Sequence, residues 1–380
     1  MAFILLAAGG TGGHLFPAEA LADALGRRGV TAALATDDRA ERYGKTFPTR
    51  DIHIITSATV RGRNPLSLLR TAVMLGIGTL QCLRLFARTR PSAVVGFGGY
   101  PTVPPVLAAT VRKIPSLIHE QNAVMGRANR FLAPRVDAIA LSFAEVLERA
   151  PKLDAKATCT GNPVRPAVVA AAAIPYAAPQ AAGAIRLLVF GGSQGARIMA
   201  DVVPAAVESL ARDLQARLVI IQQAREEDRA RVMEAYARAR VAAEVAPFFR
   251  DLPARIAASH LVVARSGAST VAELAAIGRP AILVPLPHAL DQDQSANAGV
   301  LERAGGALCL HQDKFTPDRL AREITALASA PQKLVAMAAA ARSQGAVDAA
   351  ERLADLVLRV VNSRQDVGGR AAGTQRTNNQ

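Results

Sequence analysis

The chain has 380 residues, which is too long for one ordinary hydrophobic core and predicts two domains. Its net charge of +14 favours anionic partners, but aromatic residues are only 4% and no nucleic-acid-binding signature is present, so nucleic acid is disfavoured. The three cysteines (Cys82, Cys159 and Cys309) form no CxxC pair, which argues against a disulfide framework or structural zinc site and is typical of a reducing cytoplasm.

The first glycine-rich loop follows an apolar run over residues 3–8 that is typical of a buried parallel strand. A helix is predicted from Pro17 to about Arg27, so the loop lies at the carboxyl end of the strand, where open α/β sheets bind ligands. His14 ends this loop and could take a proton from a hydroxyl beside a bound diphosphate. The alternative is that His14 only caps or packs the helix.

The segment over residues 66–85 has apolar residues at helical spacing, and arginines lie on both sides of its uncharged part. Its uncharged part, residues 71–83, is shorter than the ~18–20 residues that span a bilayer. One interpretation is a helix packed on its own sheet. The other is a helix whose exposed apolar side rests on an anionic membrane leaflet. The sequence leaves both open.

A second strand and glycine loop cover residues 94–105, and the next strand, residues 115–118, ends in four polar residues, His119 to Asn122. Such a cluster at a strand end favours a role facing a ligand. Glu120 and Asn122 are therefore candidate sugar contacts.

A stretch rich in Pro and Ala begins near Thr160 and runs to about Gly183, and it is predicted to connect the two domains. A fresh strand over residues 185–190 then leads into another glycine loop, residues 191–196, so the second half repeats the first. Neither loop matches the dinucleotide fingerprint or the P-loop, which disfavours NAD and ATP.

Further along, small and hydroxyl residues over 265–270 meet the start of a helix, which is a favourable diphosphate cradle. Glu273 follows there, either as an acid that favours the helix dipole or as an acceptor for ribose hydroxyls. Helices are expected to about Asn362, followed by a disordered polar tail over residues 363–380.

Six motifs in this order, GGTGGHLFP, HEQN, GNPVR, GGSQGA, RSGAST..E and DQDQSANA, resemble the family that adds N-acetylglucosamine (GlcNAc) to lipid I in peptidoglycan synthesis. The resemblance covers the chain to about Asn362. It implies a GT-B fold, with two Rossmann-like doubly wound α/β domains facing a cleft. The implied boundaries are 1–162 for an acceptor and membrane domain, with a helix over about 342–362 packing back on it, and 163–341 for the UDP-GlcNAc domain.

The same resemblance implies roles for individual residues. His14 matches the catalytic base, with Glu120 as the alternative base. The implied contacts to UDP-GlcNAc come from both halves of the chain: Thr11, Gly12 and Gly13 near the sugar and acceptor diphosphate, Asn122 at GlcNAc, Arg165 and Ser193 at the diphosphate, the Phe249 backbone at uracil, Ala268, Ser269, Thr270, Val271, Ala272 and Glu273 at phosphate and ribose, and Gln294 at the sugar hydroxyls. Asp293 departs from relatives that carry a second glutamine there, and a carboxylate accepts hydrogen bonds but does not donate them.

The implied activity is inverting transfer of GlcNAc from UDP-GlcNAc to the 4-hydroxyl of the muramoyl sugar of lipid I, giving lipid II. The resemblance further implies no metal site and no obligatory cofactor, with a divalent cation at most stimulatory. It implies a peripheral location on the cytoplasmic face of the cell membrane, with division or elongation proteins as partners. The rival functions are a glycolipid glycosyltransferase, a UDP-GlcNAc 2-epimerase and a non-catalytic nucleotide-sugar-binding scaffold.

Overall fold

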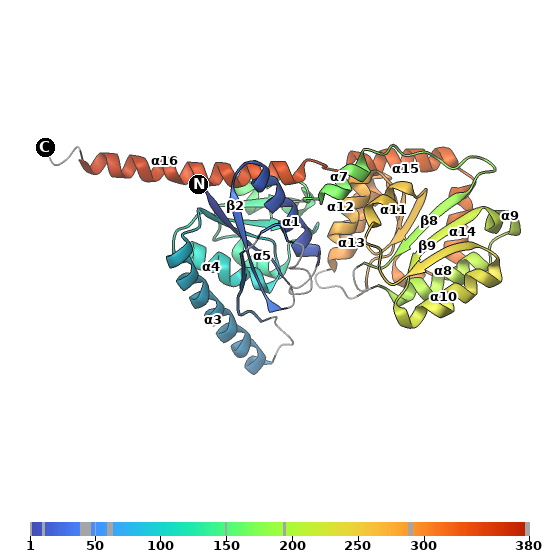
Figure 1. The fold of residues 1–380 in the computed structure, drawn as a ribbon, viewed down its shortest axis with the longest axis horizontal. Helices are drawn as coiled ribbons and strands as arrows, with labels where there is room; N and C mark the ends of the chain where they lie inside the picture. Colours follow the sequence, from blue (N-terminus) through green and yellow to red (C-terminus); the bar gives the residue numbers. More distant parts are fainter. Residues whose placement is uncertain are drawn as a thin grey trace. The chain divides into compact units, whose positions relative to one another are not determined.

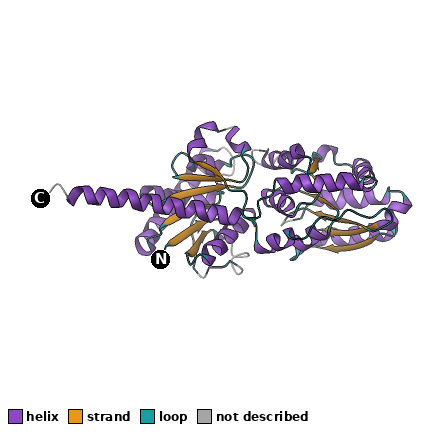
Figure 2. Cartoon of the chain, turned by 90° about the horizontal axis from the view of Figure 1, so that it is seen from above, coloured by secondary structure: helices purple, strands orange, loops and turns teal. Residues whose placement is uncertain are grey.

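The computed structural model describes residues 2–9, 12–38, 47–49, 51–58, 64–148, 150–192, 195–287 and 292–376, with side chains described to residue 364. The chain divides into two compact units. The first contains Met1–Arg165 and Asp348–Gln380, and the second contains Pro166–Val347 (Figure 1). In each unit the strands form a central sheet flanked by helices (Figure 2). This confirms the predicted fold of two Rossmann-like α/β domains.

The first unit is built on a parallel sheet of order β3-β2-β1-β4-β5-β6-β7. Its central strands are buried on both faces, which is why they read as continuous apolar runs in the sequence. The strands are β1 (Phe3–Ala7), β2 (Thr31–Thr36), β3 (Ile52–Ile54), β4 (Ala93–Gly96), β5 (Ser116–Glu120), β6 (Ala138–Leu141) and β7 (Ala157–Cys159).

The helices of the first unit cover both faces of this sheet. They are α1 (Gly12–Arg27), α3 (Pro65–Thr89), α4 (Val103–Val111), α5 (Arg127–Leu132), α6 (Glu145–Glu148) and α16 (Ala349–Arg376), with 3₁₀ turns at Tyr100–Thr102 and Pro151–Lys156. Helix α1 begins at Gly12 rather than at the predicted Pro17, because the last glycines of the loop adopt helical angles. His14 therefore lies on the first turn of α1.

Helix α16 returns to the first unit and packs on α1 (Figure 1). Leu353 and Val357 are buried in the same core as the inner face of α1. Arg28 forms ion pairs with Glu351 and Asp355 on α16, at 2.6 Å each. The chain over 363–376, expected to be disordered, instead continues α16 to Arg376.

The second unit repeats the arrangement with a parallel sheet of order β10-β9-β8-β11-β12-β13. The strands are β8 (Ile185–Phe190), β9 (Leu218–Gln223), β10 (Ala242–Ala246), β11 (Leu261–Ala264), β12 (Ala281–Leu283) and β13 (Ala307–Cys309). The helices are α7 (Pro166–Ala172), α8 (Arg197–Glu208), α9 (Arg212–Arg217), α10 (Glu226–Ala239), α11 (Leu252–Ala258), α12 (Ala268–Ile277), α13 (Asp293–Ala304), α14 (Pro317–Ala328) and α15 (Pro331–Ser343), with a 3₁₀ turn at Gln312–Lys314.

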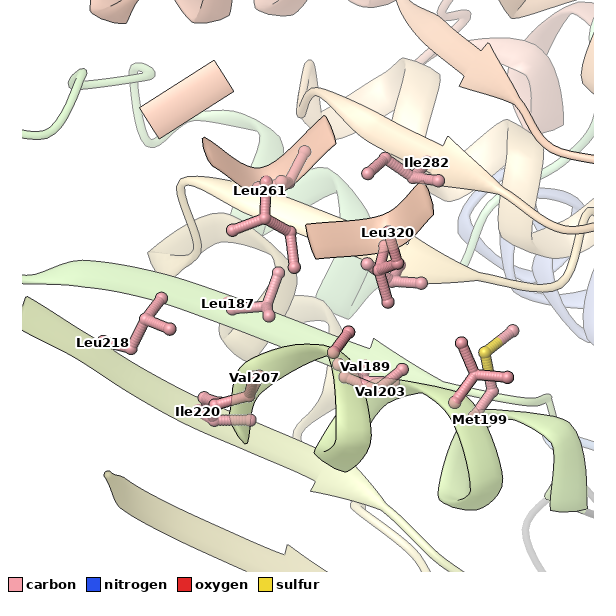
Figure 3. Close-up of a cluster of buried hydrophobic side chains, with 14 of the residues drawn as sticks. Leu187, Val189, Met199, Val203, Val207, Leu218, Ile220, Leu261, Ile282 and Leu320 are labelled. Atoms are coloured by element: carbon pink, nitrogen blue, oxygen red, sulfur yellow. The ribbon is translucent and has the colours of Figure 1, made fainter. Parts of the chain in front are cut away.

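The core of the second unit lies between its sheet and the helices α8 and α14. Figure 3 shows Leu187 and Val189 of β8 facing Val203 of α8, with Leu320 of α14 above them. These side chains are almost completely buried. The sheet is therefore a rigid base from which the loops at its carboxyl edge project.

Candidate active site

His14 is held by the two glycine loops of the first unit. Its Nδ1–H donates to the carbonyl oxygen of Gly9, with 3.2 Å between the two atoms. On its other side the ring lies against Gly98 and Gly99, where a Cβ at Gly99 would be only 3.3 Å from Cε1 of His14. Both glycines have positive φ, of 82° and 73°, so the loop needs glycine for its backbone as well as for space. Donation from Nδ1 makes Nε2 the nitrogen that would act as a general base when the ring is neutral.

Glu120 is buried at the end of β5, where both of its carboxylate oxygens accept hydrogen bonds. Oε1 accepts from the backbone and side-chain nitrogens of Asn122, at 3.0 and 3.2 Å. Oε2 accepts from the Gly126 backbone N–H at 2.9 Å and from Asn129 Nδ2 at 2.8 Å. Burial raises the pKa of Glu120, and these hydrogen bonds lower it in part. The carboxyl group thus organises the loop over residues 121–126, and this geometry favours His14 over Glu120 as the base.

His119 is also buried and connects the HEQN stretch to the segment that ends the first unit. Its Nε2–H donates to the Gly161 carbonyl oxygen at 3.0 Å, and its Nδ1 accepts from Gln121 Nε2 at 3.1 Å. Burial lowers the pKa of His119 to about 4, so its ring is neutral at neutral pH. Of the four polar residues at this strand end, only Asn122 is not fully buried, and Glu120 is the one that holds it by hydrogen bonds.

Arg165 is the last residue of the first unit and lies beside helix α1. Its guanidinium stacks on the Phe16 ring, with 4.2 Å from Cζ to the ring centroid. Burial raises the pKa of nearby Glu19, and the positive charge of Arg165 partly offsets this rise. The Phe16 ring in turn packs on Gly12, where a Cβ would lie 3.1 Å from it. Arg165 is thus attached to the helix that carries His14.

In the second unit, a short loop over residues 265–267 joins β11 to helix α12, and residues Ala268, Ser269 and Thr270 are half-buried on the first turn of α12. The hydroxyl oxygen of Ser269 is buried and has no hydrogen-bond partner among the described residues. Val271 and Ala272 are buried, and Glu273, one turn in, is only 6% exposed. The N-terminal N–H groups and hydroxyls of this turn form an arrangement that suits an anion.

Gln294 lies on the first turn of α13 and is held by the preceding loop and by the residues before α12. Its Oε1 accepts from the backbone N–H of Leu286 at 3.0 Å, and its carbonyl oxygen accepts from the Ser266 hydroxyl at 2.8 Å. Asn297 donates through Nδ2 to the Ser266 carbonyl oxygen at 3.2 Å. Ser266 and Asn297 lie in the motifs RSGAST..E and DQDQSANA, but the sequence pattern assigned neither residue a role of its own. The start of α13 is thereby fixed beside the start of α12.

Phe249 lies in the loop after β10, and its side chain is buried against Arg255 of α11. The Arg255 guanidinium is 4.3 Å from the ring centroid. Arg255 also pairs with Glu244 at 2.7 Å and with Asp251 at 2.8 Å. Because its side chain is packed in this way, Phe249 can present mainly its backbone groups to a ligand, and the uracil contact that the resemblance implies stays a prediction.

Comparison of this sequence with protein-family models and known proteins shows the family to which the chain belongs. The N-terminal domain model of glycosyltransferase family 28 matches residues 4–141, and the C-terminal domain model of this family matches residues 186–353. A relative from Rhodopseudomonas palustris (strain BisB18) is 63% identical over 357 residues, which are 94% of this chain and 95% of the relative. The chain belongs to glycosyltransferase family 28.

That family 28 relative is named UDP-N-acetylglucosamine--N-acetylmuramyl-(pentapeptide) pyrophosphoryl-undecaprenol N-acetylglucosamine transferase. A relative from Bradyrhizobium sp. (strain BTAi1 / ATCC BAA-1182) with the same name is 61% identical over 94% of this chain and 97% of its own. The solved structure of Acinetobacter baumannii MurG matches with a TM-score of 0.78 and 29% identity, covering 94% of this chain and all of that one. A UDP-GlcNAc 2-epimerase from Neisseria meningitidis matches with a TM-score of 0.68 at 14% identity, covering 94% and 100%, which shows a shared fold alone.

Two of the residues expected to contact the donor in this family 28 glycosyltransferase, Thr11 and Ser193, lie outside the described residues. Asp293, the departure noted in the sequence, accepts a hydrogen bond from the Gln294 backbone N–H at 2.7 Å. Within the described ranges, no group of three or more His, Cys, Asp or Glu side chains is placed to hold a metal ion. The remaining candidate residues gather at the carboxyl edges of the two sheets, which is where doubly wound folds bind ligands.

Proposed function

We propose that this glycosyltransferase moves GlcNAc from UDP-GlcNAc to the 4-hydroxyl of the muramoyl sugar of lipid I, with inversion at the anomeric carbon, giving lipid II for wall growth, cell shape and division. The observation that carries the proposal is 63% identity over 94% of the chain to a transferase named for this donor and acceptor. The geometry of His14, which carries its proton on Nδ1, supports it. The epimerases share the fold at much lower identity.

In the proposed mechanism, His14 Nε2 takes the proton of the muramoyl hydroxyl as that oxygen attacks the anomeric carbon. The leaving UDP gains negative charge as the bond to the sugar breaks. Arg165, Ser193 and the N–H groups at the start of α12 would stabilise this charge with no obligatory metal or other cofactor. A divalent cation would then change the rate only modestly.

The remaining assignments place the donor along the loops. Thr11, Gly12, Gly13, Asn122 and Gln294 would contact the sugar and diphosphate region. The Phe249 backbone would pair with uracil, and Glu273 would accept hydrogen bonds from the ribose hydroxyls. Because Val271 and Ala272 are buried, only their backbone groups would take part.

The test is transfer of radiolabelled GlcNAc from UDP-GlcNAc to a lipid I analogue, with the linkage of the product determined by NMR. A β-1,4-linked disaccharide lipid is the expected product, formed also when EDTA is present. Binding of UDP-GlcNAc without transfer would favour the non-catalytic scaffold. Conversion of UDP-GlcNAc to its 2-epimer without acceptor would favour an epimerase.

We also propose that helix α3 holds the enzyme on the anionic cytoplasmic leaflet as a peripheral protein. Among the described residues, α3 has the length and the apolar composition that a helix needs to cross a membrane. One face of α3 packs on its own unit through Gly78, Cys82 and Phe86, which are buried. The other face exposes Leu66, Leu69, Val73, Ile77 and Leu80, at 43% to 73%.

Arg70, Arg84 and Arg88 lie on the same helix as these exposed apolar residues. An amphipathic helix of this kind lies in the interface, with its apolar side among the acyl chains and its arginines near anionic headgroups. The two sequence interpretations of this segment are therefore compatible, because different faces of one helix serve them. Division or elongation proteins would find the enzyme at the same surface.

Replacing Leu69 or Ile77 with glutamate is expected to lower vesicle binding about tenfold or more, because each change removes an apolar side chain from the acyl region and adds a charge. The measurement is sedimentation with vesicles that contain anionic phospholipid. Met233→Glu is the matched control, since Met233 is 49% exposed on α10 of the second unit. Equal vesicle binding by all variants and the wild type would contradict the proposal that α3 attaches the enzyme to the membrane.

A further inference from the structure

Strand β9 ends in two adjacent buried glutamines that serve different parts of the second unit. Gln222 Nε2 donates to the Met199 carbonyl oxygen on α8 at 3.2 Å, and its Oε1 accepts from the Tyr236 hydroxyl of α10. These bonds tie β9 to the two helices that cover it. Gln222 is fully buried and Gln223 is 6% exposed, so both amides are within the protein and both need partners.

Gln223 makes its two hydrogen bonds to loops rather than to helices. Its Oε1 accepts from the Gly191 backbone N–H at 3.1 Å, and its Nε2 donates to the Pro247 carbonyl oxygen at 3.1 Å. Gly191 is the first residue after β8, and Pro247 is the first residue after β10. In the sheet, β9 separates β8 from β10, so these two strands share no ladder. The amide of Gln223 is thus a bridge between two loops on either side of β9.

Each of these loops is expected to receive part of the donor nucleotide. Gly191 begins the glycine loop that carries Ser193, the residue assigned to the diphosphate. A Cβ at Gly191 would lie 2.3 Å from the Ala196 backbone nitrogen, so the described ends of this loop are in close contact. A shift of Gly191 would therefore move the start of α8 as well.

Pro247 begins the loop that carries Phe249, the residue whose backbone is assigned to uracil. The far end of this loop is fixed by Arg255, through its stack on Phe249 and its ion pair with Asp251. Pro247 has no backbone N–H, so its carbonyl oxygen is the group through which Gln223 can hold the near end. The loop assigned to uracil is therefore fixed at one end by Arg255 and at the other by Gln223.

We propose that Gln223 is a positioning residue for the donor nucleotide. Its side chain fixes the distance between the loop assigned to the diphosphate and the loop assigned to uracil. This inference rests on the proposed function, because it takes UDP-GlcNAc as the donor. Loops held in their bound arrangement lose less conformational entropy when the nucleotide binds, so the bridge strengthens binding without contacting the ligand. The side chain would not take part in the chemical step.

The test compares Gln223→Met with Gln222→Met in the full-length enzyme. Methionine keeps the length of glutamine and removes both hydrogen-bonding groups. For Gln223→Met we expect the Kd for UDP, measured by calorimetry, and the KM for UDP-GlcNAc to rise about tenfold. The kcat at saturating donor and the KM for the lipid I analogue should change less than about threefold, because the substitution touches neither the catalytic base, His14, nor the acceptor site.

Gln222→Met is the matched control, since it removes an equally buried amide one residue away. It should lower the melting temperature and leave the Kd for UDP unchanged. If Gln223→Met does not fold, Gln223→Glu replaces it, because that variant keeps an acceptor for Gly191 and loses the donor to Pro247. It should show the same rise in the Kd for UDP.

The outcomes separate this inference from the proposed function. Wild-type affinity for UDP in the folded Gln223 variant would overturn the positioning role and leave the transferase function standing. An equal loss of UDP affinity in Gln222→Met would also overturn it, because the effect would then be a general softening of the sheet. A wild-type enzyme that does not bind UDP at all would contradict the proposed function itself.

Discussion

Replacing His14 with alanine is expected to slow transfer of GlcNAc to lipid I about 10²–10⁴-fold. The residue is on the first turn of α1, its Nδ1–H donates to Gly9, and its ring rests on Gly98 and Gly99. The variant loses the proton acceptor, while both glycine loops can keep their backbone conformation. The measurement is the initial rate of transfer at saturating donor and acceptor.

Two controls show whether this loss is a loss of chemistry. The His14→Ala variant should bind UDP with wild-type affinity, because the loops assigned to uracil and to the diphosphate lie mainly in the second unit. Glu120→Gln should instead lower thermal stability, since an amide nitrogen would face the donors of Gly126 and Asn129. A near-normal rate for His14→Ala, together with a folded and inactive Glu120→Gln, would move the base to Glu120.

Replacing Arg279 with methionine is expected to lower the free energy of unfolding of the second unit by about 3–5 kcal/mol. Arg279 is only 1% exposed, and its guanidinium donates to the carbonyl oxygens of Ala257, Ile277 and Gly278 and to that of Ile174. These carbonyls lie at the ends of α11 and α12 and just after α7. One cation thus satisfies groups at three helix C-termini, where the helix dipole favours positive charge.

The measurement is chemical denaturation of the full-length protein followed by circular dichroism. Arg217→Met is the matched control, because Arg217 also donates to two backbone carbonyls, those of Gly183 and Gln180, but lies nearer the surface. That change should cost less than about 1 kcal/mol. Arg279→Lys should give an intermediate loss, since lysine keeps the charge without the planar fork of donors. Equal losses for Arg279→Met and Arg217→Met would contradict the role assigned to Arg279.

The sequence by itself determined the class of fold and predicted where ligand-binding loops would occur. Buried parallel strands are apolar along their whole length, so β1 and β8 are visible as continuous apolar runs. The glycines that follow them and the hydroxyl residues at the start of α12 predict points where the backbone can come close to a ligand. These are local properties of a few consecutive residues, and for that reason they can be read before any contact is known.

Only the tertiary structure decided what each polar side chain touches. Glu120 and Asn122 are equivalent candidates in the sequence, yet the carboxylate is buried because Asn129 of α5 and the Gly126 backbone surround it. In the same way, Gln222 and Gln223 are identical neighbours that bind different elements, because successive side chains of a strand point to opposite sides. The order of the strands, set by packing between residues far apart in the chain, determines which loops adjoin, and no local pattern of residues specifies that order.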